Sequence, residues 1–330
     1  AADRRRFGQA FREIGAVSGA KKMPIVAVIG PTAVGKTAMS LDLARALNAE
    51  VISVDSRQVY RYMDVGTDKI SREVRREIPH HLIDVADPDQ VYTASDFTAQ
   101  AADCVKRIMA RGRTPLFVGG TPFYYQALFS RLLSIDVPTD EKLRAELFAL
   151  EADELYGRLK TSDPESAARL HPNDKFRVSR ALEIFLLSGR PASEWYRERP
   201  SESPYDVLYL GLFKPRDILV SGIERRVRRQ FASGYPEEVK WLLDHGYSPG
   251  LPSMQGFGYK ELALFHQGRM TLEEAIMGDV VATRQFAKRQ MTWFKKFAPA
   301  VWCDLSQKTP AENEKWLIDR ARKHLDEGSR

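Results

Sequence analysis

The stretch VIGPTAVGKTAMS, residues 28–40, contains a complete phosphate-binding motif of the form G-x-x-x-x-G-K-[ST]. The motif joins an apolar run at residues 24–30 to a helical pattern at residues 37–47. In such a loop the backbone amides curl around phosphate oxygens, and the start of the helix adds a positive dipole end. The predicted diphosphate-binding residues are Gly30, Pro31, Thr32, Ala33, Val34, Gly35, Lys36 and Thr37.

Two side chains of this loop have additional predicted roles. Lys36 would place a positive charge on the bound anion, and the hydroxyl of Thr37 would ligate magnesium. The alternative is a glycine turn before a helix that binds nothing. The loop recognises a polyphosphate, but the motif does not show that this polyphosphate belongs to a nucleotide.

Apolar runs alternate with helical patterns after this loop. A helix is predicted at residues 95–112, with Ser95 or Asp96 as its cap. Further strands are predicted at residues 50–54, 80–85, 114–120 and 205–213. Strands that alternate with helices form parallel, doubly wound sheets. We therefore predict an α/β protein with a P-loop NTPase-like parallel sheet flanked by helices.

The pattern changes in the middle of the chain, where helical patterns follow one another between proline and glycine breaks. This change predicts an all-helical insertion at residues 139–205. The α/β core would consist of residues 23–138 and 206–330, and we expect the chain after residue 215 to be mostly helical. Residues 1–22 are polar and basic, and we predict a flexible leader there.

The composition is that of a soluble globular protein, with 43% hydrophobic and 28% charged residues among 330. The sequence contains no apolar run long enough to span a bilayer, so we expect no membrane partner. Two cysteines are too few for a disulfide framework, and this favours the cytoplasm. The net charge of +6 is compatible with a polyanionic partner but does not require one.

A second polar segment, DSRQVY, follows the strand predicted at residues 50–54. We expect Asp55 to project from the carboxyl edge of the sheet, beside the phosphate loop, where ligands of open α/β sheets bind. Its carboxylate could be a turn residue, a magnesium ligand or a general base, and spacing alone does not choose among the three. Nearby Ser56, Gln58 and Tyr60 can hydrogen-bond or stack, which suits a planar heterocycle.

The phosphate loop is the first of seven sequence blocks between residues 30 and 297 that match one family. In chain order the blocks are GPTAVGKT, DSRQVYRYMDVGTDK, PHHLIDVADPDQVYTASDF, LFVGGTPFYYQAL, HPNDKFRVSRALEI, GYKEL and TRQFAKRQMTWFKKF. Together they resemble the bacterial tRNA dimethylallyltransferases, also called tRNA isopentenyltransferases. The loop alone is common, whereas this conjunction is specific and covers nearly the whole chain.

The resemblance implies a reaction. Members of this family transfer a dimethylallyl group from its diphosphate to the exocyclic amine of the adenosine 3′-adjacent to the anticodon, and diphosphate leaves. The implied partners are dimethylallyl diphosphate and the tRNA anticodon stem-loop, with magnesium as the cofactor and no obligate protein partner. The implied catalytic residues are Asp55 as the base, Thr121 beside the reacting groups, and Lys36 on the diphosphate.

Chemistry on a stacked base requires its extrusion, so the protein must grip the anticodon loop. Two basic helical stripes are candidates, one with Arg177 and Arg180 and the other with Arg284, Lys288 and Lys295, although each stripe alone is typical of a solvated helix face. The resemblance implies tRNA contacts at Asp55, Ser56, Arg57, Gln58, Thr121, Phe176, Arg177, Val178, Ser179, Arg180, Arg284, Gln285 and Lys288.

The sequence departs from the family pattern in one segment, PRDILVSGIERRV, where Gly222 occupies the position of an arginine that helps to bind diphosphate. Arg225 or Arg226 would then reach over to the anion, or Lys36 and magnesium would suffice. The turn GGTPFYY also has Pro122 where the family often has glycine, which should stiffen the turn without changing the chemistry.

Three other functions remain open from the residues alone. A prenyltransferase that acts on free adenine nucleotides would keep the fold, but it would need neither the helical insertion nor the basic stripes. An ATP-dependent small-molecule kinase would use Asp55 for magnesium or for the acceptor hydroxyl. A non-catalytic RNA-binding protein with a relic loop is disfavoured by the intact Lys36, Thr37 and Asp55.

Overall fold

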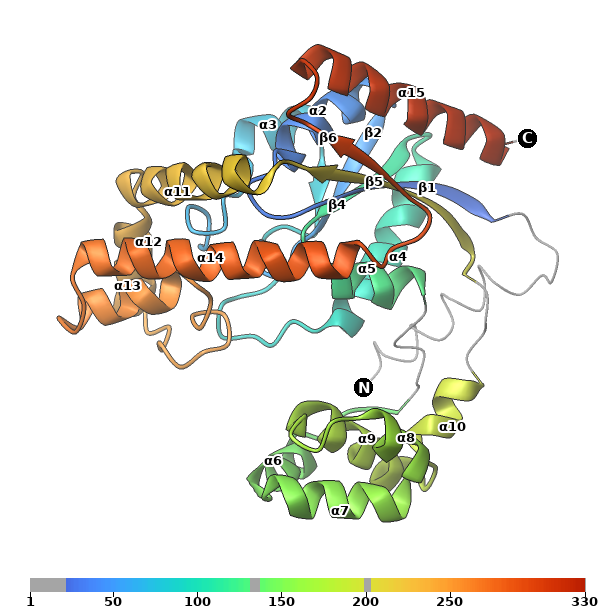
Figure 1. Ribbon diagram of the computed structural model, residues 1–330, viewed down its shortest axis with the longest axis vertical. Helices are drawn as coiled ribbons and strands as arrows, with labels where there is room; N and C mark the ends of the chain where they lie inside the picture. Colours follow the sequence, from blue (N-terminus) through green and yellow to red (C-terminus); the bar gives the residue numbers. More distant parts are fainter. Residues whose placement is uncertain (1–21, 131–136, 199–202, 330) are drawn as a thin grey trace. The chain divides into compact units, whose positions relative to one another are not determined.

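The computed structural model describes residues 22–130, 137–198 and 203–329 (Figure 1). The described chain forms two compact units. The smaller contains residues 137–198 and Ser203, and the larger contains residues 22–130 and 204–329. All but the last residue of the predicted basic leader lies outside the described residues. None of the helices described is long and apolar enough to cross a membrane.

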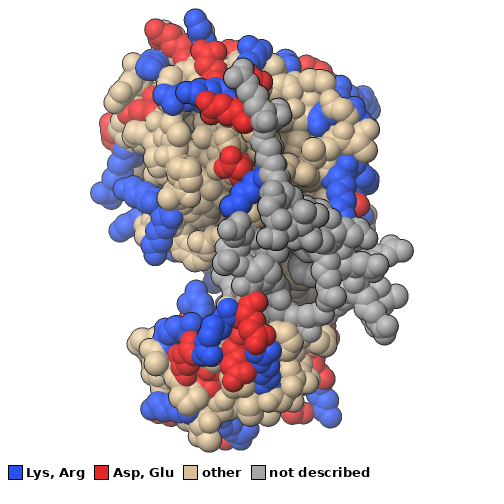
Figure 2. All heavy atoms as spheres, turned by 90° about the vertical axis from the view of Figure 1, so that its right-hand side faces the viewer, with Lys and Arg blue, Asp and Glu red and all other residues tan. Residues whose placement is uncertain are grey.

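The smaller unit is all-helical, with helices α6 (Glu141–Ala149), α7 (Ala152–Ser162), α8 (Pro164–Arg169), α9 (Lys175–Ser188) and α10 (Ala192–Arg197). Aspartate side chains cap three of them, since Asp140, Asp163 and Asp174 each accept a hydrogen bond from a first-turn amide. A core of leucine, valine and alanine side chains joins the helices. On the face of the molecule in Figure 2, Lys and Arg are interspersed with Asp and Glu.

The larger unit is built on a six-stranded sheet in the order β3-β2-β4-β1-β5-β6. Every pair of neighbouring strands is parallel, which confirms the predicted α/β fold class. The strands are β1 (Met23–Ile29), β2 (Ala49–Val54), β3 (His80–His81), β4 (Thr114–Gly119), β5 (Tyr205–Phe213) and β6 (Ala300–Asp304).

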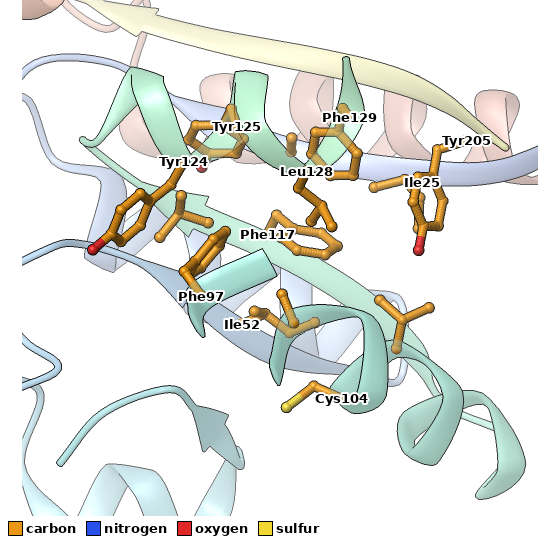
Figure 3. Packing of buried hydrophobic residues seen from close by; sticks show 14 of the residues in the cluster. Ile25, Ile52, Phe97, Cys104, Phe117, Tyr124, Tyr125, Leu128, Phe129 and Tyr205 are labelled. Atoms are coloured by element: carbon orange, nitrogen blue, oxygen red, sulfur yellow. The ribbon is translucent and has the colours of Figure 1, made fainter. Parts of the chain in front are cut away.

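Helices cover both faces of this sheet. Helices α2 (Lys36–Ala46) and α15 (Pro310–Ser329) pack on one face, and α4 (Ala94–Ala110) and α5 (Pro122–Phe129) pack on the other. On the α5 face, Phe117 of β4 meets Phe129 edge-on with ring centroids 5.0 Å apart (Figure 3). Tyr125 is buried and donates to the carbonyl of Val28 at 3.1 Å, so α5 is anchored directly to β1.

A helical layer follows β5 in the chain. It contains α11 (Arg216–Ala232), α12 (Tyr235–Asp244), α13 (Tyr259–His266) and α14 (Leu272–Phe294). These helices share an apolar core with the long segment that follows β2, including Val59 and Met63. That segment also contains the short helix α3 (Arg72–Glu77). The segment carrying Asp55 is therefore held between the sheet and the helical layer.

Two local predictions were wrong, and one strand was missed. Strand β6 was not predicted, because a five-residue strand between a long helix and a polar turn gives little periodic signal. The strand expected at residues 80–85 shrinks to His80–His81. The cap of α4 is Thr93, which forms a reciprocal capping box with Asp96, so Asp96 is the third residue of the helix and not the cap itself.

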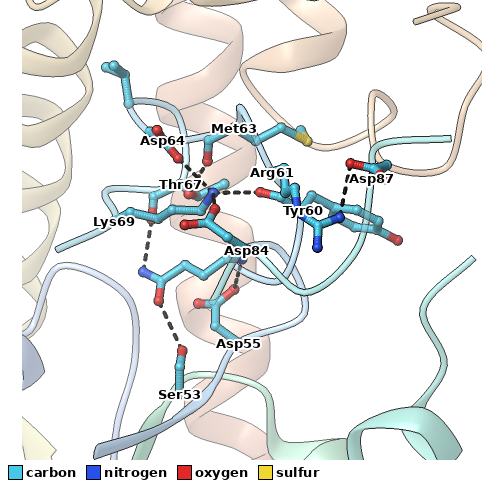
Figure 4. A network of polar contacts seen from close by, with 12 residues as sticks. Ser53, Asp55, Tyr60, Arg61, Met63, Asp64, Thr67, Lys69, Asp84 and Asp87 are labelled. Atoms are coloured by element: carbon cyan, nitrogen blue, oxygen red, sulfur yellow. Dashed lines mark hydrogen bonds and ion pairs between the residues drawn. The ribbon is translucent and has the colours of Figure 1, made fainter. Parts of the chain in front are cut away.

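A buried lysine organises the segment between β2 and β3 (Figure 4). The ammonium of Lys69 donates to Asp64 at 2.7 Å, to Asp84 at 2.6 Å and to the carbonyl of Tyr60 at 2.5 Å, and its side chain is only 2% exposed. On the other side of the segment, Glu238 of α12 accepts from three consecutive amides, those of residues 64–66. Lys69 and Glu238 thus fix the loop that begins at Asp55.

We expect Lys69→Met to lower the free energy of unfolding by about 3 kcal/mol, because it removes the buried cation that pairs with Asp64 and leaves Asp84 with Arg75 alone. Urea titration followed by circular dichroism measures this change. The control is Lys240→Met, which removes an exposed ion pair with Asp244 and should cost less than about 1 kcal/mol. Equal costs for the two variants would contradict the role given to Lys69.

Candidate functional site

The phosphate loop joins β1 to α2 and needs its glycines for close packing. Gly30 has φ of 150°, and a Cβ there would lie 2.5 Å from the carbonyl oxygen of Leu212 on β5. Gly35 has φ of 113° and precedes the first residue of α2. The first turn of α2 carries no acidic residue, so the positive end of the helix faces the loop without a competing carboxylate.

Lys36 folds back over the loop. Its ammonium donates to the carbonyls of Gly30 at 3.0 Å and Pro31 at 2.8 Å. Burial lowers the pKa of Lys36 to about 8; nearby Asp55 opposes this shift and Arg226 adds to it. The site therefore holds a desolvated positive charge in a position that an anion would stabilise.

A second cation reaches the loop from α11. Arg226 donates through Nη1 to the hydroxyl of Thr32 at 2.6 Å, and its Nε lies 3.4 Å from a carboxylate oxygen of Asp68. Of the two arginines that the sequence offers as substitutes at the anion, Arg226 is the one placed at the loop, whereas Arg225 is exposed on the helix.

Gly222 lies one helical turn before Arg226 and also faces the loop. A Cβ at Gly222 would lie 3.8 Å from the carbonyl oxygen of Ala33, which is an ordinary contact distance. Apart from the helix's own backbone and the residues next to Gly222 in the chain, no other atom of the described residues lies within 4 Å of that position. A side chain at residue 222 would therefore point toward the phosphate loop, so the glycine leaves open space at the edge of the site.

Asp55 follows β2 and is partly buried. Its Oδ1 accepts from the amides of Arg57 at 2.8 Å and Gln58 at 3.3 Å. Both bonds go to the same oxygen, so the carboxylate is held in one orientation. Within the described part of the chain, Oδ2 has no hydrogen-bond partner and can accept a proton from a ligand.

Thr121 meets the Asp55 loop because the strands that lead to the two residues are neighbours. In the register of β2 and β4, Val54 pairs with Gly119, and a Cβ at Gly119 would lie 2.0 Å from the carbonyl oxygen of Val54. The hydroxyl of Thr121 accepts from the amide of Ser56 at 3.1 Å. Thr121 directly precedes α5, but its side chain makes no capping bond to that helix.

Two residues of the predicted adenine-contacting segment use their side chains within the protein. The guanidinium of Arg57 donates to the carbonyls of Ser253 at 2.5 Å and Pro252 at 3.5 Å. The amide of Gln58 accepts from Ser53 and donates to the backbone of residues 67 and 68. These bonds hold the segment against the rest of the larger unit, and contact with adenine remains a prediction for both residues.

The predicted RNA stripe on α9 divides into exposed and buried residues. Phe176 is 69% exposed, and the exposed Arg177 pairs with Asp174 of its own helix. Val178 and Ser179 are buried in the smaller unit, so their side chains do not face solvent on α9, and contact of these two residues with tRNA stays a prediction.

The last residue of that stripe has partners of its own. Arg180 donates to the buried carboxylate of Glu183 at 2.7 Å and to the carbonyl of Val137 at 2.9 Å. Arg144 of α6 donates to the same carboxylate at 3.0 Å. Arg180 therefore ties α9 to the chain before α6, and its contact with RNA stays a prediction.

The second predicted stripe lies on α14, where Gln285 and Lys288 are exposed and Arg284 pairs with Glu224 of α11 at 3.2 Å. The opposite face of α14 is buried and includes Gln290. Our sequence reasoning missed Gln290. Gln290 is a polar residue at the helical spacing of the buried positions Thr283, Ala287 and Phe294, and this pattern could have identified it.

The phosphate loop offers a magnesium ion the hydroxyl of Thr37, and oxygens of a bound ligand would have to complete the site. No group of three His, Cys, Asp or Glu side chains in the described ranges could hold a metal ion. The hydroxyl of Thr37 is exposed in the first turn of α2. One hydroxyl beside a diphosphate is a donor set typical of magnesium, which commonly keeps substrate phosphates among its ligands.

The chain is similar to known proteins over most of its length. The model of the family described as IPP transferase matches residues 58–297. The tRNA dimethylallyltransferase of Thermomicrobium roseum is 43% identical over 314 residues, which are 93% of this chain and 94% of that relative. The tRNA dimethylallyltransferase of Symbiobacterium thermophilum is 45% identical over 289 residues, which are 86% of this chain and 90% of that relative.

Solved structures give the same assignment. The full-length tRNA isopentenylpyrophosphate transferase of Bacillus halodurans is 40% identical, with a TM-score of 0.71 over 94% of this chain and 98% of that one. A eukaryotic dimethylallyltransferase acting on tRNA is 30% identical, with a TM-score of 0.79 over 91% of this chain and 79% of that one. With the phosphate loop, Asp55 and Thr121 at one edge of a parallel sheet, this chain belongs to the IPP transferase family.

Proposed function

We propose that this protein is a tRNA dimethylallyltransferase. It transfers the dimethylallyl group of dimethylallyl diphosphate to the exocyclic amine of the adenosine 3′-adjacent to the anticodon, and releases diphosphate. The observation that supports this most directly is the hydrogen bond from the amide of Ser56 to the hydroxyl of Thr121, at 3.1 Å. It joins the loop of the proposed base to the turn that follows β4, next to the phosphate loop.

The donor side of the site suits a leaving diphosphate. When the bond between the allylic carbon and the diphosphate oxygen breaks, the electron pair leaves with the diphosphate. Lys36 and Arg226 lie where that charge develops, and fixed cations in a desolvated site stabilise it strongly. The amide of Thr32 is bonded to Gln290 at 2.8 Å, so we expect the anion to use the amides that follow it.

The acceptor side needs a base, because the lone pair of an aromatic amine is delocalised and makes it a weak nucleophile. As the amine nitrogen bonds to the allylic carbon, its proton passes to Oδ2 of Asp55. Oδ1 stays bonded to the amides of Arg57 and Gln58 and holds the carboxylate in place. Thr121 stabilises the same loop from the neighbouring strand.

Thr37 is the residue that would hold magnesium, together with oxygens of the diphosphate. The ion, when bound, would neutralise charge on the leaving group.

We propose that exposed residues of each unit contact the tRNA. These are Phe176 and Arg177 on α9, and Gln285 and Lys288 on α14. Aromatic and guanidinium groups stack on unpaired bases, and ammonium groups bind phosphates. We place this activity in the cytoplasm, because its substrate is tRNA.

The test is transfer of label from radioactive dimethylallyl diphosphate to unmodified tRNA. Label should enter tRNA and should not enter AMP. Asp55→Asn should lower the rate by about 10²- to 10⁴-fold, because the amide keeps the loop bonds through its oxygen but cannot take a proton. Pyrophosphate binding should stay within about twofold of wild type.

The control is Asp42→Asn on α2, which changes a carboxylate paired with Arg45 away from the site and should leave the rate unchanged. Label in AMP would favour an enzyme that acts on free nucleotides. ATP consumption without prenyl transfer would favour a kinase. Loss of pyrophosphate binding in Asp55→Asn would assign Asp55 to a metal instead of a proton.

We further propose that Arg226 binds the diphosphate in place of the arginine that is absent at residue 222. Arg226→Gln should raise the Michaelis constant for the donor roughly 10- to 100-fold, because it removes a charged hydrogen bond. Gly222→Arg has room beside the loop and should restore much of this loss when added to Arg226→Gln. No recovery in the double variant would contradict this assignment.

Donor affinity should depend on pH through Lys36. Bound diphosphate favours the ammonium form, so binding takes up a proton wherever free Lys36 is neutral. Affinity for an unreactive thio analogue of the donor should be constant below the Lys36 pKa of about 8 and fall by up to about tenfold per pH unit above it.

Calorimetry between about pH 7 and about pH 9.5 measures this fall. In Lys36→Arg the positive charge persists across the whole range, so the fall should vanish. In Arg226→Gln the fall should begin at a higher pH, because a neighbouring positive charge is gone. A wild-type affinity that is independent of pH would show that Lys36 is charged throughout.

A further inference from the structure

Gln290 of α14 bonds to two loops of the site at once. Its side-chain oxygen accepts from the amide of Thr32 at 2.8 Å, and its side-chain nitrogen donates to the carbonyl of Gly120 at 2.5 Å. The residue is only 3% exposed. Thr32 belongs to the phosphate loop and Gly120 to the turn before Thr121, so a single buried amide spans the gap between them.

The turn approaches the Gln290 side chain closely at Gly120. A Cβ at Gly120 would lie 2.4 Å from the side-chain nitrogen of Gln290 and 3.6 Å from the ammonium of Lys36. At the first distance, a side chain on residue 120 would force the end of the Gln290 side chain to shift. The glycine at residue 120 therefore allows Gln290 to approach the turn.

The chain of contacts continues to the proposed base. Thr121 follows Gly120, and its hydroxyl accepts from the amide of Ser56, the residue after Asp55. The contacts run from Thr32 through Gln290 and Thr121 to the Asp55 loop. The same helix carries Gln285 and Lys288 on its exposed face.

We infer that Gln290 is a positioning residue that sets the spacing between the phosphate loop and the Thr121 turn. This inference rests on the proposed function. By fixing the two loops, Gln290 keeps the donor diphosphate at the right distance from the acceptor amine. Its helix links this spacing to the surface proposed for tRNA. Misplacing reacting groups by about 1 Å can cost roughly 10²-fold in rate.

An amide satisfies both loops at every pH. The amide of Thr32 needs an acceptor, and the carbonyl of Gly120 needs a donor. Glutamate would supply the acceptor, but as a carboxylate it would repel the Gly120 carbonyl, whereas the protonated acid could donate to it. Methionine would fill the volume and satisfy neither loop. The two substitutions therefore separate the loss of one bond from the loss of both.

The test compares Gln290→Met and Gln290→Glu with Thr283→Val, a control that removes one buried hydrogen bond, to Asp279, from the same helix. Gln290→Met should lower kcat for tRNA prenylation about 10²-fold, while tRNA affinity stays within about twofold. It should also weaken pyrophosphate binding about tenfold. Gln290→Glu should recover activity relative to wild type as the pH falls and the acid becomes protonated.

Thermal midpoints separate positioning from simple destabilisation. Gln290→Met and Thr283→Val should lose comparable stability, but only Gln290→Met should lose kcat and pyrophosphate affinity. Equal kinetics for these two variants would overturn the inference, as would a Gln290→Glu profile that follows wild type at every pH. If wild type itself does not label tRNA, the proposed function fails, and pyrophosphate affinity alone then decides the role of Gln290.

Discussion

The parallel pairing of three neighbouring strands is the constraint on which the whole site depends. Gly119 at the end of β4 pairs with Ile29 of β1 on one side and with Val54 of β2 on the other. The three strands therefore end at the same level of the sheet. Their loops begin at Gly30, Asp55 and Gly120, and these loops carry the anion cradle, the proposed base and Thr121.

The charged side chains at this edge of the sheet favour an anionic ligand. Lys36 and Arg226 lie together at the loop, and desolvation makes the ammonium of Lys36 easier to deprotonate than in water. An anion that replaces the lost water restores the ammonium form. Asp55 is close enough to oppose the shift, so the site combines two cations, proposed to bind the leaving group, with one carboxylate that is proposed to take a proton.

Sequence reasoning predicted the parts of the site that lie in continuous motifs. The phosphate loop, Asp55 and Thr121 each follow a strand, and the fold class fixes which edge they share. The sequence left Arg225 and Arg226 as alternatives, and Gln290 was missed. The roles of Arg226 and Gln290 depend on which turn of a helix contacts which loop, and this contact is made only in the folded chain. Val178 and Ser179 were predicted inside a contiguous block without regard to the buried side of α9.

The most direct test of the site at the ends of β1, β2 and β4 is a crystal structure with an unreactive donor analogue and an anticodon stem-loop RNA. The account places the diphosphate between Lys36 and Arg226, with the exocyclic amine of the extruded adenine hydrogen-bonded to Oδ2 of Asp55. A diphosphate bound outside the loop between β1 and α2, or an adenine amine facing away from Asp55, would contradict it.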